Sequence, residues 1–280
     1  RHFNSIIRLP FKGIWDSFLL GNEIQRDDAV YFIFCEGNMF AYRWHYLEHI
    51  RKKYRNARLI FYFRNCLLEY SGLLKSWEAI KSYYDAGITM NRADAEKMGI
   101  LFNDYWPCIL PDKQFQPENQ SDVYFVGQAK DRLPKILEVF SKLKDAGLKC
   151  NFRVTGVPED KQKYADKITY TTGKWQFISY DEILQNVMNT KCVLEILPFN
   201  QNYSSLRPLE ALWYRKKLLT TNQEAVNEWF YNPEIVQMFR NADDIDTDFI
   251  RRPADTAIYD KMNIGDFNIF AEWLMKNVPV

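Results

Sequence analysis

The sequence has little cysteine, little net charge and no long apolar run, and each absence argues against a class of protein. Its five cysteines are scattered over 280 residues and form no Cys-x-x-Cys pair, which argues against a disulfide framework or a zinc site. The formal net charge of +1 lacks the basic excess of a general nucleic-acid binder. No apolar run approaches the roughly 18 residues of a membrane span. We therefore expect a cytoplasmic protein that has no nucleic acid among its partners.

Apolar and aromatic residues, in contrast, are plentiful. Hydrophobic residues make up 47% and aromatic residues 16% of the chain, which is ample for a buried core and excludes extended disorder. In the first half, strand-length apolar runs at 29–35, 58–63 and 87–91 are separated by amphipathic helical patterns. Alternation of this kind predicts a parallel sheet with helical crossovers.

The same alternation restarts after residues 107–122, a polar stretch with three prolines that is typical of a linker. We expect further strands at 122–127, 149–156, 191–197 and 216–222, with helices between them. Two Rossmann-like halves are the simplest architecture for this pattern. The fold class that we predict is therefore α/β, with two Rossmann-like domains whose parallel sheets face across a cleft.

Ligands of open α/β sheets bind at the carboxyl ends of the strands, so the loops that follow the expected strands are the candidate sites. Gly127 directly follows one strand, with Lys130 and Arg132 just beyond it, and Gly156 follows the next. A glycine lets the backbone approach a phosphate group, which the two cations would neutralise. A turn glycine beside two solvated charges is the competing explanation, and the spacing alone does not decide between them.

The most informative stretch is "SSLRPLEAL". Pro208 suits the first turn of a helix, and Ser204 and Ser205 are candidate caps for that helix. Arg207 offers a fork of donors to phosphate oxygens, and Glu210 lies one helical turn away on the same face. A cation for phosphate and a carboxylate for ribose hydroxyls are what a nucleotide diphosphate needs. The alternative is an ordinary surface ion pair of little energetic value.

The run from "DVYFVGQAKDR" through "SYDEILQNVMNTKCVLEIL" to "SLRPLEALWYRKKLLTTN" resembles the donor-binding half of GT-B glycosyltransferases. It is most similar to bacterial enzymes of capsule and lipopolysaccharide synthesis. The strands "VYFIFCEG" and "RLIFYFRN" are similar to the acceptor half, so the resemblance covers most of residues 9–225. It implies a nucleotide-sugar donor of unresolved UDP or GDP type, a glycan or lipid-linked glycan acceptor, and no metal or other cofactor.

The resemblance also implies roles for individual residues. Ser204, Ser205 and Arg207 match the phosphate-binding loop of the family. Gly127, Lys130 and Arg132 match the residues opposite that loop. Glu210 matches the ribose-binding glutamate of the family. Many retaining members carry a second glutamate, but the corresponding position here is Asn202, and Glu195 has the wrong spacing. The stereochemistry therefore stays open. Trp175 or Phe177 is expected to stack on the nucleobase.

Further candidates follow the strands of the first half. Glu36 follows the strand at 29–35 and is a candidate general base for the acceptor hydroxyl, with a plain turn glutamate as the alternative. Arg64 and Asn65 follow the second strand and are candidate acceptor-side contacts. Arg207 would stabilise the leaving nucleotide electrostatically.

We expect residues 1–112 to form an acceptor-side domain, with loss of its first strand as one alternative. Residues 113–262 would form the nucleotide-sugar-binding domain, and a helix at 263–280 would pack back on the first domain. The basic run at 51–58 complements the dipole of a helix end; the alternative is contact with anionic lipid at the inner face of the membrane. Two other functions stay open: a sugar-nucleotide epimerase of the same fold, and a non-catalytic partner subunit.

Overall fold

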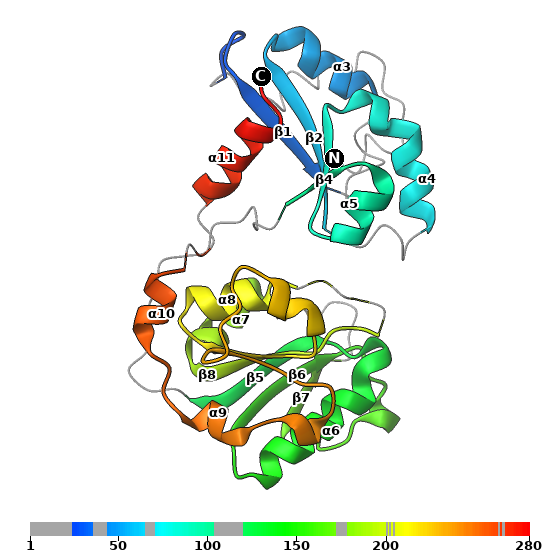
Figure 1. Cartoon of the computed structure of the whole chain (residues 1–280). Helices are drawn as coiled ribbons and strands as arrows, with labels where there is room; N and C mark the ends of the chain where they lie inside the picture. Colours follow the sequence, from blue (N-terminus) through cyan, green and yellow to red (C-terminus); the bar gives the residue numbers. More distant parts are fainter. Residues whose placement is uncertain are drawn as a thin grey trace. The chain divides into compact units, whose positions relative to one another are not determined.

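The structure is a computed structural model in which two compact units are distinguished (Figure 1). It describes residues 24–35, 44–64, 71–103, 120–171, 178–199, 201, 203, 205–262, 264 and 267–280. The first unit comprises Arg1–Tyr105 with Asn268–Val280, and the second comprises Trp106–Phe267. Each unit has an α/β fold around its own parallel sheet, as the alternation of apolar runs and amphipathic stretches predicted.

The first unit contains a four-stranded sheet in the order β1-β2-β3-β4, and each neighbouring pair is parallel. Its strands are β1 (Val30–Cys35), β2 (Ala57–Phe63), β3 (Ala86–Thr89) and β4 (Leu101–Phe102). Its helices are α3 (Trp44–Lys53), α4 (Ser71–Ile80), the 3-10 turn η2 (Lys81–Tyr83), α5 (Arg92–Met98) and α11 (Phe267–Asn277). β2 is apolar at almost every position because both of its faces are covered: Phe61 and Phe63 pack beside Trp77, whereas Ile60 and Tyr62 pack beside α11.

Helix α11 comes from the far end of the chain and completes the core of the first unit. It contributes to one cluster of buried side chains, made of Ile60, Tyr62, Ile88, Phe270, Leu274 and Val278. Two hydrogen bonds fix the tail that follows the helix: the Tyr31 hydroxyl donates to the carbonyl of Val278 at 2.8 Å, and Nε of Arg58 donates to the carbonyl of Pro279 at 2.8 Å. Residues that are more than 200 positions apart therefore share one core.

The second unit contains a six-stranded parallel sheet in the order β10-β9-β8-β5-β6-β7. Its strands are β5 (Ser121–Gln128), β6 (Cys150–Thr155), β7 (Ile168–Thr171), β8 (Thr190–Glu195), β9 (Lys217–Thr220) and β10 (Val236–Met238). The sequence predicted four of them, and the short outer strands β7 and β10 were missed. From β5 the chain proceeds outward through β6 and β7, and from β8 it proceeds the other way. The strand order therefore reverses between β5 and β8, which is where open α/β sheets bind ligands.

Helices and 3-10 turns connect these strands. They are η3 (Lys130–Arg132), α6 (Leu133–Asp145), η4 (Glu159–Lys161), α7 (Tyr180–Met188), α8 (Arg207–Trp213), η5 (Gln223–Asn227), η6 (Ala242–Asp244), α9 (Thr247–Arg251) and α10 (Thr256–Asp260). Alternate residues of β5 face opposite sides of the sheet, so Val123 and Phe125 pack in one cluster with Ile136 and Phe140 of the amphipathic helix α6. These buried contacts support the end of β5, from which the candidate site begins.

Candidate functional site

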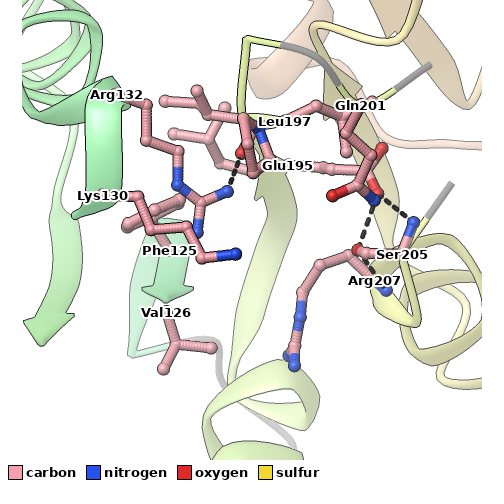
Figure 2. A pocket seen from close by; sticks show the side chains of 12 residues that line it. Phe125, Val126, Lys130, Arg132, Glu195, Leu197, Gln201, Ser205 and Arg207 are labelled. Atoms are coloured by element: carbon pink, nitrogen blue, oxygen red, sulfur yellow. Dashed lines mark hydrogen bonds between the residues drawn. The ribbon is translucent and has the colours of Figure 1, made fainter. Parts of the chain in front are cut away.

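A cavity of about 210 Å³ lies at the carboxyl ends of β5 and β8, at the point where the strand order reverses (Figure 2). Its lining consists of Phe125, Val126, Lys130, Arg132, Leu194, Glu195, Ile196, Leu197, Pro198, Gln201, Ser205 and Arg207. Cavities that enclose a whole drug-sized ligand measure roughly 300–1,000 Å³. This cavity therefore suits one polar part of such a ligand, such as its phosphate groups.

Three of the residues that line the cavity are cations, namely Lys130, Arg132 and Arg207, and one is acidic, Glu195. Lys130 and Arg132 belong to η3, directly after β5, whereas Arg207 is the first residue of α8. The structure thus brings together three cations that the sequence singled out in two loops more than 70 residues apart. A concentration of positive charge at this place favours an anionic ligand.

Backbone carbonyl groups hold Arg132 in place. Its Nε donates to the carbonyl of Gln128 at 2.9 Å, and its Nη1 donates to the carbonyl of Ile196 at the end of β8. The guanidinium also lies over the ring of Phe125, 5.7 Å from the ring centroid. Burial lowers the pKa of Arg132, and the charge of Arg207 acts in the same direction. Arg132 is therefore a partly buried cation with a fixed orientation.

Gly127 is the last residue but one of β5 and stands beside the same guanidinium. A Cβ atom at residue 127 would lie 2.7 Å from Nη2 of Arg132, which is too close for a carbon atom, so the tip of the arginine would have to shift. The sequence attributed this glycine to approach of the backbone to a phosphate. In the structure its close neighbour is the side chain of Arg132, so the glycine makes room for that cation.

Glu195 ends β8 and connects three elements through its carboxylate. Its Oε1 accepts a hydrogen bond from the backbone N–H of Ser205 at 2.8 Å and another from the Ser205 hydroxyl at 2.7 Å. Its Oε2 accepts a hydrogen bond from the hydroxyl of Thr220, at the end of β9, at 2.6 Å. Sequence reasoning set Glu195 aside because of its spacing. The signal that could have identified it is a carboxylate inside the otherwise apolar run at 192–197.

The hydrogen bonds to Glu195 bear on the role predicted for Ser205. Both hydrogen-bond donors of Ser205 point at Glu195, so in this structure the residue offers neither of them to a phosphate. Its Oγ accepts the backbone N–H of Arg207 at 3.1 Å. The N-cap position of α8 is Leu206, whose side chain makes no capping hydrogen bond, so of the two candidate caps it is Ser205 that meets a first-turn N–H, while Ser204 lies outside the described residues. Ser205 instead caps the helix from one position farther out.

Arg207 and Glu210 form an ion pair through Nη1 and Oε2, as their spacing on one helix face predicted. The pair is not on the surface, because the side chain of Glu210 is 0% exposed and that of Arg207 is 17% exposed. Oε1 of Glu210 accepts a hydrogen bond from the hydroxyl of Tyr180, the first residue of α7, at 3.1 Å. Burial raises the pKa of Glu210, and the charge of Arg207 opposes this shift. Glu210 lies outside the cavity lining, so its contact with a ribose stays a prediction.

The remaining predicted residues are dispersed or lie outside the described residues. Gly156 follows β6 with a positive φ of 75° and is not part of the cavity lining. Arg64 follows β2 in the first unit and is exposed. Five others fall outside the described residues: Glu36, Asn65, Trp175, Phe177 and Ser204.

In the part of the chain that the structure describes, no group of three or more His, Cys, Asp or Glu side chains is placed to hold a metal ion. Among the helices in the described ranges, none combines the length and the apolar character needed to cross a membrane.

No family model matches the sequence, and no curated protein matches it. Solved structures do share its fold. TarM superposes with a TM-score of 0.58 at 9% identity, over 95% of this chain and 58% of the TarM chain, so this chain spans little more than half of that structure. UDP-N-acetylglucosamine 2-epimerase from Rickettsia bellii matches at a TM-score of 0.43 and 14% identity, covering 92% of this chain and 72% of the epimerase. The glycotransferase of kitacinnamycin matches at a TM-score of 0.43 and 10% identity, covering 89% of this chain and 76% of the glycotransferase.

At 9% identity, the likeness to TarM is evidence of the fold alone. Together with the two parallel sheets of four and six strands, it confirms the predicted α/β class with two Rossmann-like units, the GT-B type of fold. The two matches at a TM-score of 0.43 are too distant to add to this conclusion.

Proposed function

We propose that the protein is a GT-B glycosyltransferase that takes a nucleotide-diphosphate sugar as donor and binds its diphosphate in the cavity of the second unit. One observation carries the proposal: three cations from two distant loops, Lys130, Arg132 and Arg207, line one cavity at the reversal point of a parallel sheet. The resemblance of the sequence to enzymes of capsule and lipopolysaccharide synthesis supports the choice of reaction. The acceptor that we propose is a glycan or lipid-linked glycan of a bacterial surface polysaccharide.

The cations have a chemical task in this reaction. When the bond between the sugar carbon and the diphosphate breaks, its electron pair stays on the phosphate oxygen and negative charge develops there. Arg132, which two carbonyl groups already orient, needs no rearrangement to meet that charge. Donors fixed in advance stabilise a transition state more than mobile ones do. We therefore propose that Lys130, Arg132 and Arg207 compensate the leaving group without a metal ion.

The other half of the reaction forms a bond between the acceptor oxygen and the sugar carbon, and the acceptor proton passes to a base. Glu36 stays our candidate for that base if the configuration inverts. Arg64 and Asn65 stay candidates for acceptor contact, and Glu210 stays the candidate for ribose contact.

We also propose that the protein is located in the cytoplasm. Contact with the inner face of the membrane is a secondary proposal, supported by the basic residues Arg51, Lys52 and Lys53 in the last turn of α3.

The binding step is tested first. The melting temperature of the protein is measured with UDP, GDP, CMP and ADP, with and without magnesium, because a ligand that binds only the folded state raises it. We expect one nucleoside diphosphate to raise the melting temperature without magnesium. Lys130→Met should weaken that ligand about tenfold, the size of one charge-assisted hydrogen bond. The matched control Lys161→Met replaces an exposed lysine outside the cavity lining and should leave the affinity unchanged.

Failure of every nucleotide to raise the melting temperature would contradict the proposed donor site. Product analysis then separates the remaining functions. Transfer of sugar to an acceptor supports a glycosyltransferase, whereas conversion of the nucleotide sugar without an acceptor indicates an epimerase. Binding without any turnover indicates a non-catalytic partner subunit.

A further inference from the structure

Glu195 is the only acidic residue among the twelve that line the cavity in Figure 2. A carboxylate beside a site for anions repels the ligand that the site would bind. The residue is nevertheless only 2% exposed, so its charge is desolvated and its position is set by the fold. Neighbouring cations are therefore expected to compensate this charge, because buried charges in proteins are paired.

Glu195 shares the lining of the cavity with the three cations, whereas its carboxylate oxygens accept hydrogen bonds from the uncharged donors of Ser205 and Thr220. Arg132 donates to the carbonyl of Ile196, the residue directly after Glu195. Ser205 connects the carboxylate to the backbone N–H of Arg207 through its hydroxyl. Burial lowers the pKa of Arg132, whereas the charges of Asp131 and Glu195 raise it. The carboxylate therefore attracts the cations with which it lines the cavity while no ligand is bound.

We propose that Glu195 is the resident counter-anion of the cavity: it offsets part of the positive charge of the lining while the site is empty, and it weakens the affinity of the site for a diphosphate. This inference rests on the proposed function and extends it, since a glycosyltransferase must release its nucleoside diphosphate product after each turnover. Glu195 is a positioning residue, which acts on the ligand through the cations and through Ser205.

A second explanation is that Glu195 serves only as a hydrogen-bond acceptor that holds the loop in place. Glu195→Gln separates the two explanations, because glutamine has nearly the same shape and its carbonyl oxygen can still accept both hydrogen bonds from Ser205. Thr220→Val is the matched control. It removes the hydroxyl that donates to Oε2 of Glu195 and keeps the charge of the carboxylate.

The experiment measures the affinity of the wild type and of both variants for inorganic pyrophosphate, by calorimetry and by the rise in melting temperature. If Glu195 is the counter-anion, the Glu195→Gln variant should bind pyrophosphate more tightly, by about fivefold or more, because a negative charge near the ligand has been removed. Thr220→Val should be less stable and should not bind pyrophosphate more tightly. An unchanged or weaker affinity of Glu195→Gln would overturn the proposal.

If the buried substitution leaves the empty protein unfolded, that outcome is also decisive. The proposal then requires that pyrophosphate restores the folded state by replacing the lost counter-charge; a variant that stays unfolded with pyrophosphate contradicts it. The two proposals fail separately. If pyrophosphate behaves as expected but no nucleoside diphosphate binds more tightly than pyrophosphate, the counter-anion stands and the nucleotide-donor site does not.

Discussion

The guanidinium of Arg132 fills the space that a side chain at Gly127 would need. A Cβ atom on residue 127 would lie 2.7 Å from Nη2 and 3.6 Å from Cζ of Arg132. The guanidinium uses this space while it donates to the carbonyl groups of Gln128 and Ile196. The orientation of a cation in the cavity therefore depends on the absence of a methyl group on β5.

Gly127→Ala should displace the guanidinium of Arg132 and cost about 1 kcal/mol of stability, at the low end for overpacked positions, because the nearest atom is the tip of a flexible side chain. It should also weaken the binding of pyrophosphate, because the cation leaves its hydrogen bonds. The measurement is a double-mutant cycle with Arg132→Ala, followed by denaturant unfolding and by binding. In the Arg132→Ala background the methyl group has room, so Gly127→Ala should then be nearly neutral. Equal costs in both backgrounds would show that the contact does not matter.

The buried carboxyl of Glu210 predicts a pH dependence of stability. Burial raises its pKa above the ordinary value of 4.5, so the folded protein keeps this proton at a pH where the unfolded chain has released it. In the window above pH 4.5 the folded state binds more protons, and the free energy of unfolding falls as the pH rises. Glu210→Gln removes this contribution. Urea unfolding of both proteins across that window is the measurement. The free energy of unfolding of the wild type should fall relative to that of Glu210→Gln as the pH rises. A difference that stays constant with pH would refute the assignment.

Tyr180→Phe should reduce stability by about 1 kcal/mol, because Oε1 of the buried Glu210 loses a hydrogen bond from the tyrosine hydroxyl. The same change should raise the affinity for nucleoside diphosphates relative to pyrophosphate, since a ribose no longer competes with that hydroxyl for the carboxylate. Tyr170→Phe is the matched control, because its hydroxyl donates to the carbonyl of Lys163 and not to Glu210. If both variants change the affinity ratio equally, Glu210 does not bind the ribose.

Phe270→Ala should destabilise the first unit by about 3–5 kcal/mol, the usual cost of removing a buried phenylalanine side chain. The ring is 0% exposed and packs in the cluster with Ile60 and Tyr62. Hydrogen exchange is the measurement of choice, because it reports on each strand. Exchange at the amides of β2 should accelerate while that at β5 stays unchanged. Met275→Ala, at a side chain that is 52% exposed, should leave both strands protected, and faster exchange in β5 would contradict the assignment of α11 to the first unit.

The predicted strands β2 and β8 contain apolar runs whose residues are buried on both faces of the sheet, and such runs are visible without knowledge of the fold. β1 was predicted from its apolar residues in the same way, although it is an edge strand and mostly half-buried. β7 and β10 have four and three residues, of which only the first is buried in each strand, and neither contains an apolar run. β9 also has four residues, but it is buried at every position and was predicted. The place of β7 and β10 follows from the neighbouring strands, which single-sequence patterns do not encode.

The candidate site was predictable to the extent that its contacts are local. Arg207 and Glu210 are three residues apart, so helix geometry alone brings them together. The partners of Glu195 are 10 and 25 residues away and reach it only because β8 and β9 are neighbours. The contact between Gly127 and Arg132 depends on a side-chain rotamer after a 3-10 turn, and no spacing rule describes it.

The core of the first unit has a consequence for the order in which the protein folds during synthesis. Its central strand β2 is translated early, but the helix that covers one face of β2 is translated only after Trp106–Phe267, the whole second unit, has been made. The second unit can therefore fold on the ribosome while Ile60 and Tyr62 still lack Phe270. During that interval the nascent chain carries an uncovered apolar sheet face of the kind that chaperones bind.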